Sequence, residues 1–214
     1  MPPVVPDPLA VPVLALAAAL AWAAGLRPYL VVLALGVASW QGWTGLPGAL
    51  GLFAHPAVLA AAALMAAVEW RADRIRGLDC LWDAVHTPIR IPAGATLAAL
   101  ALWPQPLPVA LLVGAAGGLL AASSHLTKSA VRALLHAHPL AHAPCRRLSL
   151  AEEVAAIGVL CAALTFPLAG LLLVALALVL SGWLAPRLWQ RLARVRRELQ
   201  PMLTGDRLRL SGLR

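Results

Sequence analysis

Two uncharged stretches, each longer than thirty residues, limit what this chain can fold into. Residues 91–124 carry no charged side chain over 34 positions, and residues 154–186 carry none over 33. A helix that crosses a bilayer core of roughly 30 Å needs about 20 apolar residues. Each stretch has room for nearly two such helices, and prolines near its middle divide it. The pattern indicates a polytopic membrane protein.

Composition supports this class and excludes others. Hydrophobic residues make up 61% of the 214, against 17 basic and 9 acidic residues. A disordered chain, an ordinary cytosolic enzyme and a soluble nucleic-acid binder are excluded, because the arginines sit in a few blocks between apolar runs. The three cysteines form no Cys-x-x-Cys pair, so neither a disulfide framework nor a thiolate metal site is expected. Residues 1–8 lack the basic segment of a signal peptide, so we expect the first apolar run to be retained.

The apolar segments predict an all-α fold, a polytopic membrane bundle of about seven helices. We place them near residues 9–26, 28–43, 55–70, 89–103, 109–124, 149–166 and 168–186. The segments at 28–43 and 89–103 are short, as expected of half-helices or re-entrant pieces buried in protein. Alternatively, residues 9–39 form one broken span, which moves only the N-terminus to the other side. We expect residues 1–186 to form the transmembrane domain and residues 187–214 a basic amphipathic tail.

The basic residues predict the orientation. With this helix order all 17 lysines and arginines fall on one face, and the opposite loops, 44–54 and 104–108, carry no charge. Basic loops face the cytoplasm. We therefore expect an inner-membrane protein whose C-terminus is cytoplasmic and whose tail rests on anionic lipid. Tryptophans should line both interfaces, and nucleic acid is not an expected partner.

Two polar stripes flank the hairpin that turns at residues 104–108. Their members recur at spacings of three and four, so each set shares one helix face. The first stripe is Asp79, Asp83, His86 and Arg90, and the second is His125, Lys128 and Arg132. The hairpin brings both to one end, where we expect Asp79 and Asp83 to pair with Lys128 or Arg132. Such a stripe can bind an ion or relay protons, or it is a solvated face with weak local ion pairs.

Four further residues are candidates at the same membrane face. Arg27 breaks two apolar runs and either binds an anion at the start of the next helix or extends to the interface. Glu69 and Asp73 form an interfacial salt-bridge cluster or line the same opening as the stripes. Ser149 and Glu152 match a capping box, which assigns Glu152 a structural role and makes Glu153 the better functional candidate.

No pattern indicates catalysis or a cofactor. A Gly-rich phosphate loop, a nucleophile elbow and a His-Glu-x-x-His motif are all missing from the sequence. The imidazoles of His136, His138 and His142 could bind a transition metal, but carboxylates and thiolates at suitable spacing are lacking beyond Cys145. We therefore expect neither an enzyme nor a bound metal or cofactor.

Several motifs together resemble a known family. The first, Gly25–Leu30, reads Gly-Leu-Arg-Pro-Tyr-Leu. A second, within Val68–Gly94, contains Glu-Trp-Arg-Ala-Asp-Arg and Trp-Asp-Ala-Val-His-Thr. The last two are Ser124–Leu134 and Ser149–Glu153. Over roughly residues 15–185 the chain resembles a bacterial integral-membrane family known as domain of unknown function 4126. The resemblance implies membrane embedding and no established activity.

The convergence of the stripes predicts the function. We expect a small channel or carrier for an ion or a small polar solute, because titratable groups would meet at one opening of the bundle. The alternative is a membrane scaffold or assembly factor, in which the same groups only hold helices together. The sequence leaves open whether the chain forms a homo-oligomer.

Overall fold

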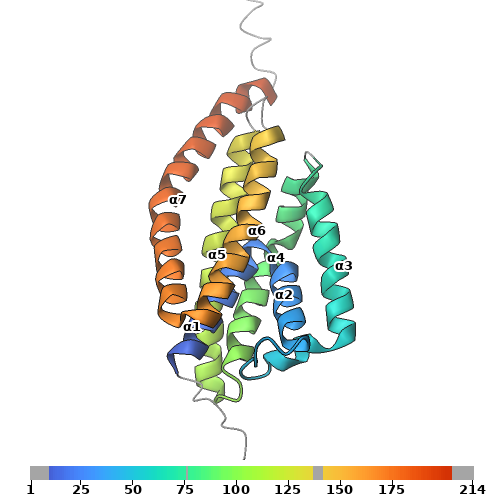
Figure 1. Cartoon of the computed structure of the whole chain (residues 1–214). Helices are drawn as coiled ribbons and strands as arrows, with labels where there is room; N and C mark the ends of the chain where they lie inside the picture. Colours follow the sequence, from blue (N-terminus) through green and yellow to red (C-terminus); the bar gives the residue numbers. More distant parts are fainter. Residues whose placement is uncertain (1–9, 76, 137–141, 204–214) are drawn as a thin grey trace, which may run out of the picture.

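The computed structural model describes residues 10–75, 77–136 and 142–203, and this part of the chain is helical without a strand (Figure 1). The element order is α1 Val11–Leu26, α2 Pro28–Trp40, η1 Leu50–Ala54, α3 Pro56–Ala72, α4 Leu78–Ala101, α5 Leu107–His136, α6 His142–Thr165 and α7 Pro167–Leu203. The all-α prediction is confirmed. Proline stands at the first or second position of α1, α2 and α3, where its fixed φ suits a helix start.

Helices α1 and α2 form a hairpin whose turn lies inside the bundle (Figure 1). Their 16 and 13 residues correspond to about 24 Å and 20 Å. The hairpin starts and ends at the same end of the bundle and turns at Arg27, whose φ of −146° and ψ of 70° interrupt the helix. Residues 28–40 therefore form a short apolar helix that ends three residues before the expected boundary at residue 43.

The structure corrects the second expected half-helix, at residues 89–103. Instead of starting near residue 89, helix α4 runs over 24 residues from Leu78 to Ala101 and continues through Pro88 and Pro92. The helix extends beyond the expected start because each proline removes only one amide donor from its hydrogen bonds. Packing of the buried polar stripe against α5 stabilises the turns before the prolines. The stripe and the apolar segment are thus parts of one helix.

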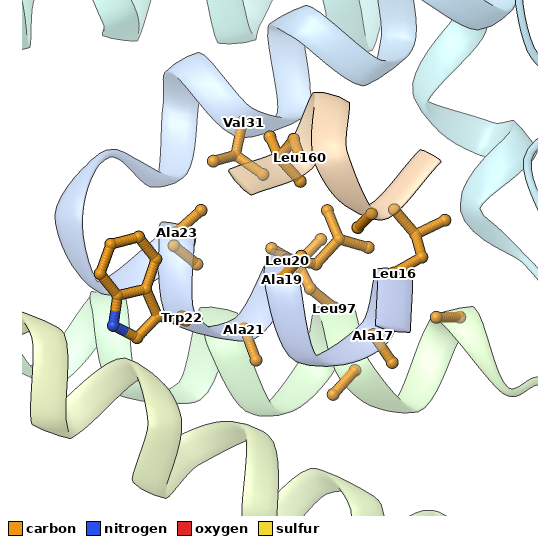
Figure 2. Close-up of a cluster of buried hydrophobic side chains, with 14 of the residues drawn as sticks. Leu16, Ala17, Ala19, Leu20, Ala21, Trp22, Ala23, Val31, Leu97 and Leu160 are labelled. Carbon is orange, nitrogen blue, oxygen red and sulfur yellow. The ribbon is translucent and has the colours of Figure 1, made fainter. Parts of the chain in front are cut away.

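The core surrounds α1, which is buried along most of its length. Helices α4, α5, α6 and α7 all pack on it. Figure 2 shows Leu16, Leu20 and Trp22 of α1 with Leu97 of α4 and Leu160 of α6. Between these large side chains α1 is mainly alanine, so neighbouring helices approach its backbone closely. The hairpin tip is thereby held at a fixed depth.

Three helical segments in the described part are long and apolar enough to cross a membrane, which is typical of a membrane protein. They are residues 107–136, 146–165 and 167–194. This is fewer than the seven apolar segments expected, because α1 and α2 are apolar but shorter and α4 carries a charged stripe. Helix α7 continues from Pro167 to Leu203, so no helix end separates residue 186 from the basic tail.

Gly25 allows the closest approach between α1 and α5. A Cβ atom built there would overlap the Ser124 hydroxyl and the Ala121 carbonyl oxygen, whereas one built at Gly158 meets nothing within 4 Å. We expect Gly25→Ala to lower the free energy of unfolding by about 1–3 kcal/mol through overpacking. Thermal unfolding of the detergent-purified protein measures the effect. Gly158→Ala is the matched control, and equal stability of the two variants would contradict the close approach.

Candidate functional site

Eight charged side chains meet inside the bundle at the tip of the α1–α2 hairpin. Each is at most 5% exposed. The set, called the ion network below, contains four cations, Arg27, Arg90, Lys128 and Arg132, and four carboxylates, Glu69, Asp73, Asp83 and Glu152. The formal charges therefore cancel. A buried charge costs several kcal/mol unless it is paired, so this balance is what allows the network to be buried.

Asp83 of α4 lies among three cations. Its Oδ1 is 2.6 Å from Arg90 Nη1 and 3.4 Å from Lys128 Nζ, and its Oδ2 is 3.2 Å from Arg132 Nη1. The predicted pairing of Asp83 with Lys128 and Arg132 across the α4–α5 hairpin is confirmed. Arg90 also reaches Glu69 of α3 at 2.5 Å, which joins α3 to this hairpin.

Asp73, at the C-terminal end of α3, forms ion pairs with two arginines. Arg132 Nη1 donates to Asp73 Oδ1 at 2.7 Å, and Arg132 Nη2 donates to Oδ2 at 3.1 Å. Arg27 forms an ion pair with the same Oδ2. Burial alone would raise the pKa of Asp73, but the hydrogen bond from Arg132 and the charges of Arg27 and Arg132 outweigh it and hold this pKa below its usual range. Asp73 is therefore ionised at neutral pH and fixes the end of α3.

Arg27 is buried and ion-paired, so it does not extend to the interface. Its Nη2 contacts Asp73, lies 3.4 Å from Glu152 Oε2 and 3.6 Å from Glu153 Oε1, and donates to the Ser149 hydroxyl. All of these contacts use one nitrogen. Its Nε has no hydrogen-bond partner among the described residues. Arg27 therefore joins α1 and α2 to α3 and α6 while part of its donor capacity is unused.

The C-terminal end of α1 is also satisfied by this site. Lys128 Nζ donates to the Leu26 carbonyl, the last of α1, at 2.9 Å, and one turn earlier the Ser124 hydroxyl donates to the Trp22 carbonyl inside the helix at 2.7 Å. The last carbonyls of a helix lack intrahelical partners and carry partial negative charge. Lys128 thus compensates a helix end as well as two carboxylates, Asp83 and Glu152.

The two candidate histidines differ in their surroundings. His125 Nδ1 is 3.1 Å from Arg90 Nη1, which can only donate, so Nδ1 accepts and Nε2 carries the proton toward the Thr87 hydroxyl at 2.8 Å. Thr87 in turn donates to the Asp83 carbonyl. His86 instead stacks on Trp82, with ring centroids 3.9 Å apart. His125 is thus connected to the ion network, and His86 packs beside it.

A cleft of about 310 Å³ opens between α2 and α3 next to the network. Its walls are apolar residues of the two helices, including Leu30, Leu33 and Ala66, and its polar lining is Arg27, Glu69 and Glu153. Glu153 is 24% exposed on its side chain, unlike its buried neighbour Glu152. Three of the predicted candidate residues therefore line one cleft.

Asp79 does not pair with Lys128 or Arg132, so that prediction was wrong. Its Oδ2 lies 2.6 Å from His136 Nε2, and its Oδ1 accepts from the amides of Gly77 and Cys80. Asp79 stands one turn nearer the start of α4 than Asp83, so it meets the end of α5 instead of the middle. The ion network and the Asp79–His136 pair are separate groups.

The predicted capping box was also wrong. Helix α6 begins at His142, so Ser149 lies inside the helix and its hydroxyl donates to Asp73 at 3.2 Å. Glu152 Oε2 is 2.7 Å from Arg132 Nη2, so Glu152 belongs to the ion network. The sequence had indicated only a capping role for it. A sequence signal existed, because Glu152 lies just before the uncharged stretch 154–186, at the same membrane face as the other candidates.

Some predicted features lie outside the described residues. These are the start of the chain, Arg76, His138 and the last arginines, Arg207, Arg209 and Arg214.

A family model described as a domain of unknown function, DUF4126, matches residues 14–187. This segment contains the whole ion network and the cleft. No curated protein and no solved structure matches the chain. The chain therefore belongs to the DUF4126 family, which the resemblance of its motifs predicted.

Proposed function

We propose that this protein is a small membrane carrier or channel whose site for an ion or small polar solute is the cleft at the hairpin tip. One observation carries the proposal: the α1–α2 hairpin is broken at Arg27, inside the bundle and among charges. Broken helices that end within a membrane domain place backbone and charged groups where solutes bind in many transporters. Here the break adjoins a cleft with both a cation and carboxylates in its lining.

Helix α3 is the element suited to open the site. It packs mainly on α2 and η1, at the edge of the bundle (Figure 1). At the network end, Glu69 pairs with Arg90 and Asp73 pairs with Arg27 and Arg132. A solute that competes for Arg27 or Glu69 would weaken these pairs and let α3 move. Two arrangements of α3 would then expose the cleft alternately.

The proposed orientation of the protein in the membrane rests on its charged and aromatic residues. Trp40, Trp43 and Trp103 are exposed near one end of the bundle, and Trp70 and Trp183 are exposed toward the other. Tryptophans favour the two interfaces of a membrane. The end with the network carries the basic residues, so it is the cytoplasmic side of the inner membrane in our proposal. The hairpin tip then lies about 20 Å from the outer end of α2.

Topology reporters test this orientation. We expect a fusion after Arg214 to be active only with a reporter that works in the cytoplasm, because all 17 basic residues belong to that face. An insertion at Gly48, in the uncharged loop, should be active only with a reporter that works in the periplasm. Swapped activities would show that the charge distribution does not set the orientation.

Charge movement in proteoliposomes on a solid-supported membrane tests transport. Concentration jumps of Na⁺, K⁺, phosphate and small carboxylates, together with pH jumps, would serve as probes. We expect at least one jump to give a current above that of empty liposomes. Because all contacts of Arg27 use Nη2, Arg27→Lys should preserve the fold but reduce the current at least about tenfold, since lysine lacks the planar fork of donors.

The matched control is Arg71→Lys, an exposed position near the end of α3. It should leave both fold and current unchanged. No current with any probe would overturn the proposal, and an unchanged current in Arg27→Lys would remove Arg27 from the site.

A membrane scaffold is the second candidate. It is favoured because every network cation has a carboxylate within 3.4 Å, as expected of groups that only join helices. If the protein is a scaffold, the concentration jumps should give no current. Variants of the ion network should then lose a complex that co-purifies with the unaltered protein.

A further inference from the structure

We propose a transition-metal site, of the type that binds Zn²⁺, where the start of α4 meets the end of α5. The three ligands are the Asp79 carboxylate, the Cys80 thiolate and the His136 imidazole. Their ligand atoms all lie within 4.8 Å of one another. The site is separate from the ion network and does not depend on a transport function.

The carboxylate is positioned before any metal binds. Asp79 is 2% exposed, and its Oδ1 is held by the amides of Gly77 at 3.0 Å and Cys80 at 2.9 Å. Its Oδ2 faces His136 Nε2 at 2.6 Å. In a tetrahedral zinc site the ligand atoms are about 3.3–3.7 Å apart, from metal–ligand lengths of roughly 2.0–2.3 Å, and the nitrogen–oxygen distance is at the short end of this range. The imidazole would therefore withdraw by about 0.7 Å to admit the metal.

The donor set selects the class of metal. A thiolate and an imidazole suit Zn²⁺ and similar divalent transition metals, whereas Mg²⁺ and Ca²⁺ prefer oxygen ligands alone. The thiolate and the carboxylate together cancel the charge of a divalent ion. Metal binding would displace the thiol proton, and the proton on His136 Nε2 would move to Nδ1 or be released, so that two metal bonds replace the Asp79–His136 hydrogen bond. Three protein ligands leave a fourth position for water.

The location explains why sequence reasoning did not find the site. In the sequence, Cys80 belongs to no Cys-x-x-Cys motif, and His136 is grouped with the histidines that follow it. The α4–α5 hairpin brings them together from 56 positions apart. A metal here would tie the two helix ends that lie beyond the network, which should stabilise the hairpin.

Cobalt binding to the full chain tests the site. The parent variant is Cys145→Ser/Cys161→Ser, purified in detergent with an affinity tag free of histidine, so that Cys80 is its single thiol. We expect one equivalent of Co²⁺ to give the near-ultraviolet absorption of a cobalt–thiolate bond and Zn²⁺ to displace it. Cys80→Ser should abolish this absorption, and His136→Ala should weaken Zn²⁺ binding at least about tenfold. His55→Ala, at the opposite end of the bundle, is the control and should bind as the parent does.

A second measurement is independent of how the variants fold. Zn²⁺ should slow alkylation of Cys80 in the folded parent at least about tenfold, because a coordinated thiolate is less available to the reagent. A folded parent that shows neither cobalt–thiolate absorption nor protection by Zn²⁺ would overturn the proposal. Absorption that persists in Cys80→Ser would do the same.

Discussion

Arg132→Met should destabilise the protein more than the loss of any other single network side chain. Arg132 contacts three carboxylates, Asp73, Asp83 and Glu152, at 2.7–3.2 Å. Removing one partner from a buried ion pair costs roughly 3–5 kcal/mol, because the remaining charge is uncompensated. Total stabilities are about 5–15 kcal/mol. We therefore expect a large loss of folded protein, measured by the midpoint of thermal unfolding and by the monodisperse yield in detergent.

Two variants separate charge from packing in this prediction. Arg132→Met/Asp73→Asn restores a neutral network and should recover part of the loss, because one carboxylate no longer needs a partner. Arg71→Met removes an exposed arginine of α3 and should change stability little. If the double variant were as unstable as the single one, the cost would come from packing and not from the unpaired charge.

The sequence predicted the parts of the site that depend on helix periodicity. Asp83 and Arg90 share one face of α4, Lys128 and Arg132 share one face of α5, and the turn between the helices brings these faces together. This geometry needs only residue spacing and a proline turn. The depth of matching residues on a hairpin then follows from the rise per residue, which is why the Asp83 pairings could be anticipated.

What remained hidden was the contribution of the other helices. Glu69, Asp73 and Glu152 each have a plausible local partner, so the sequence left an interfacial cluster open beside a place at the stripes' opening for Glu69 and Asp73, and assigned Glu152 to a cap. The structure gives them distant partners, since the α1–α2 hairpin stops inside the bundle and Arg27 needs carboxylates there. Spacing within one helix does not reveal which third helix packs across it. The number of residues in a buried network is therefore underestimated from sequence wherever local ion pairs offer a simpler explanation.

The double variant Asp83→Lys/Lys128→Asp should be at least as unstable as either single variant, although it conserves net charge. A simple pair across the hairpin would tolerate the exchange. In the structure, however, a lysine at position 83 would lie between Arg90 and Arg132. An aspartate at position 128 would face Glu152 and the carbonyl of Leu26 at the end of α1. Both exchanged groups would thus meet like charge or a helix end of the wrong sign.

The comparison for this prediction is Asp83→Asn/Lys128→Met, which also conserves net charge but places no group beside its own sign. It should retain more folded protein than the exchanged pair, as measured by size-exclusion profiles of both variants at equal expression. The difference reports the surroundings of each position, because the net charge of the network is the same in the two proteins. Recovery of near-normal yield by the exchanged pair would mean that Asp83 and Lys128 act as an isolated pair, and the eight-membered network would then have to be divided into independent contacts.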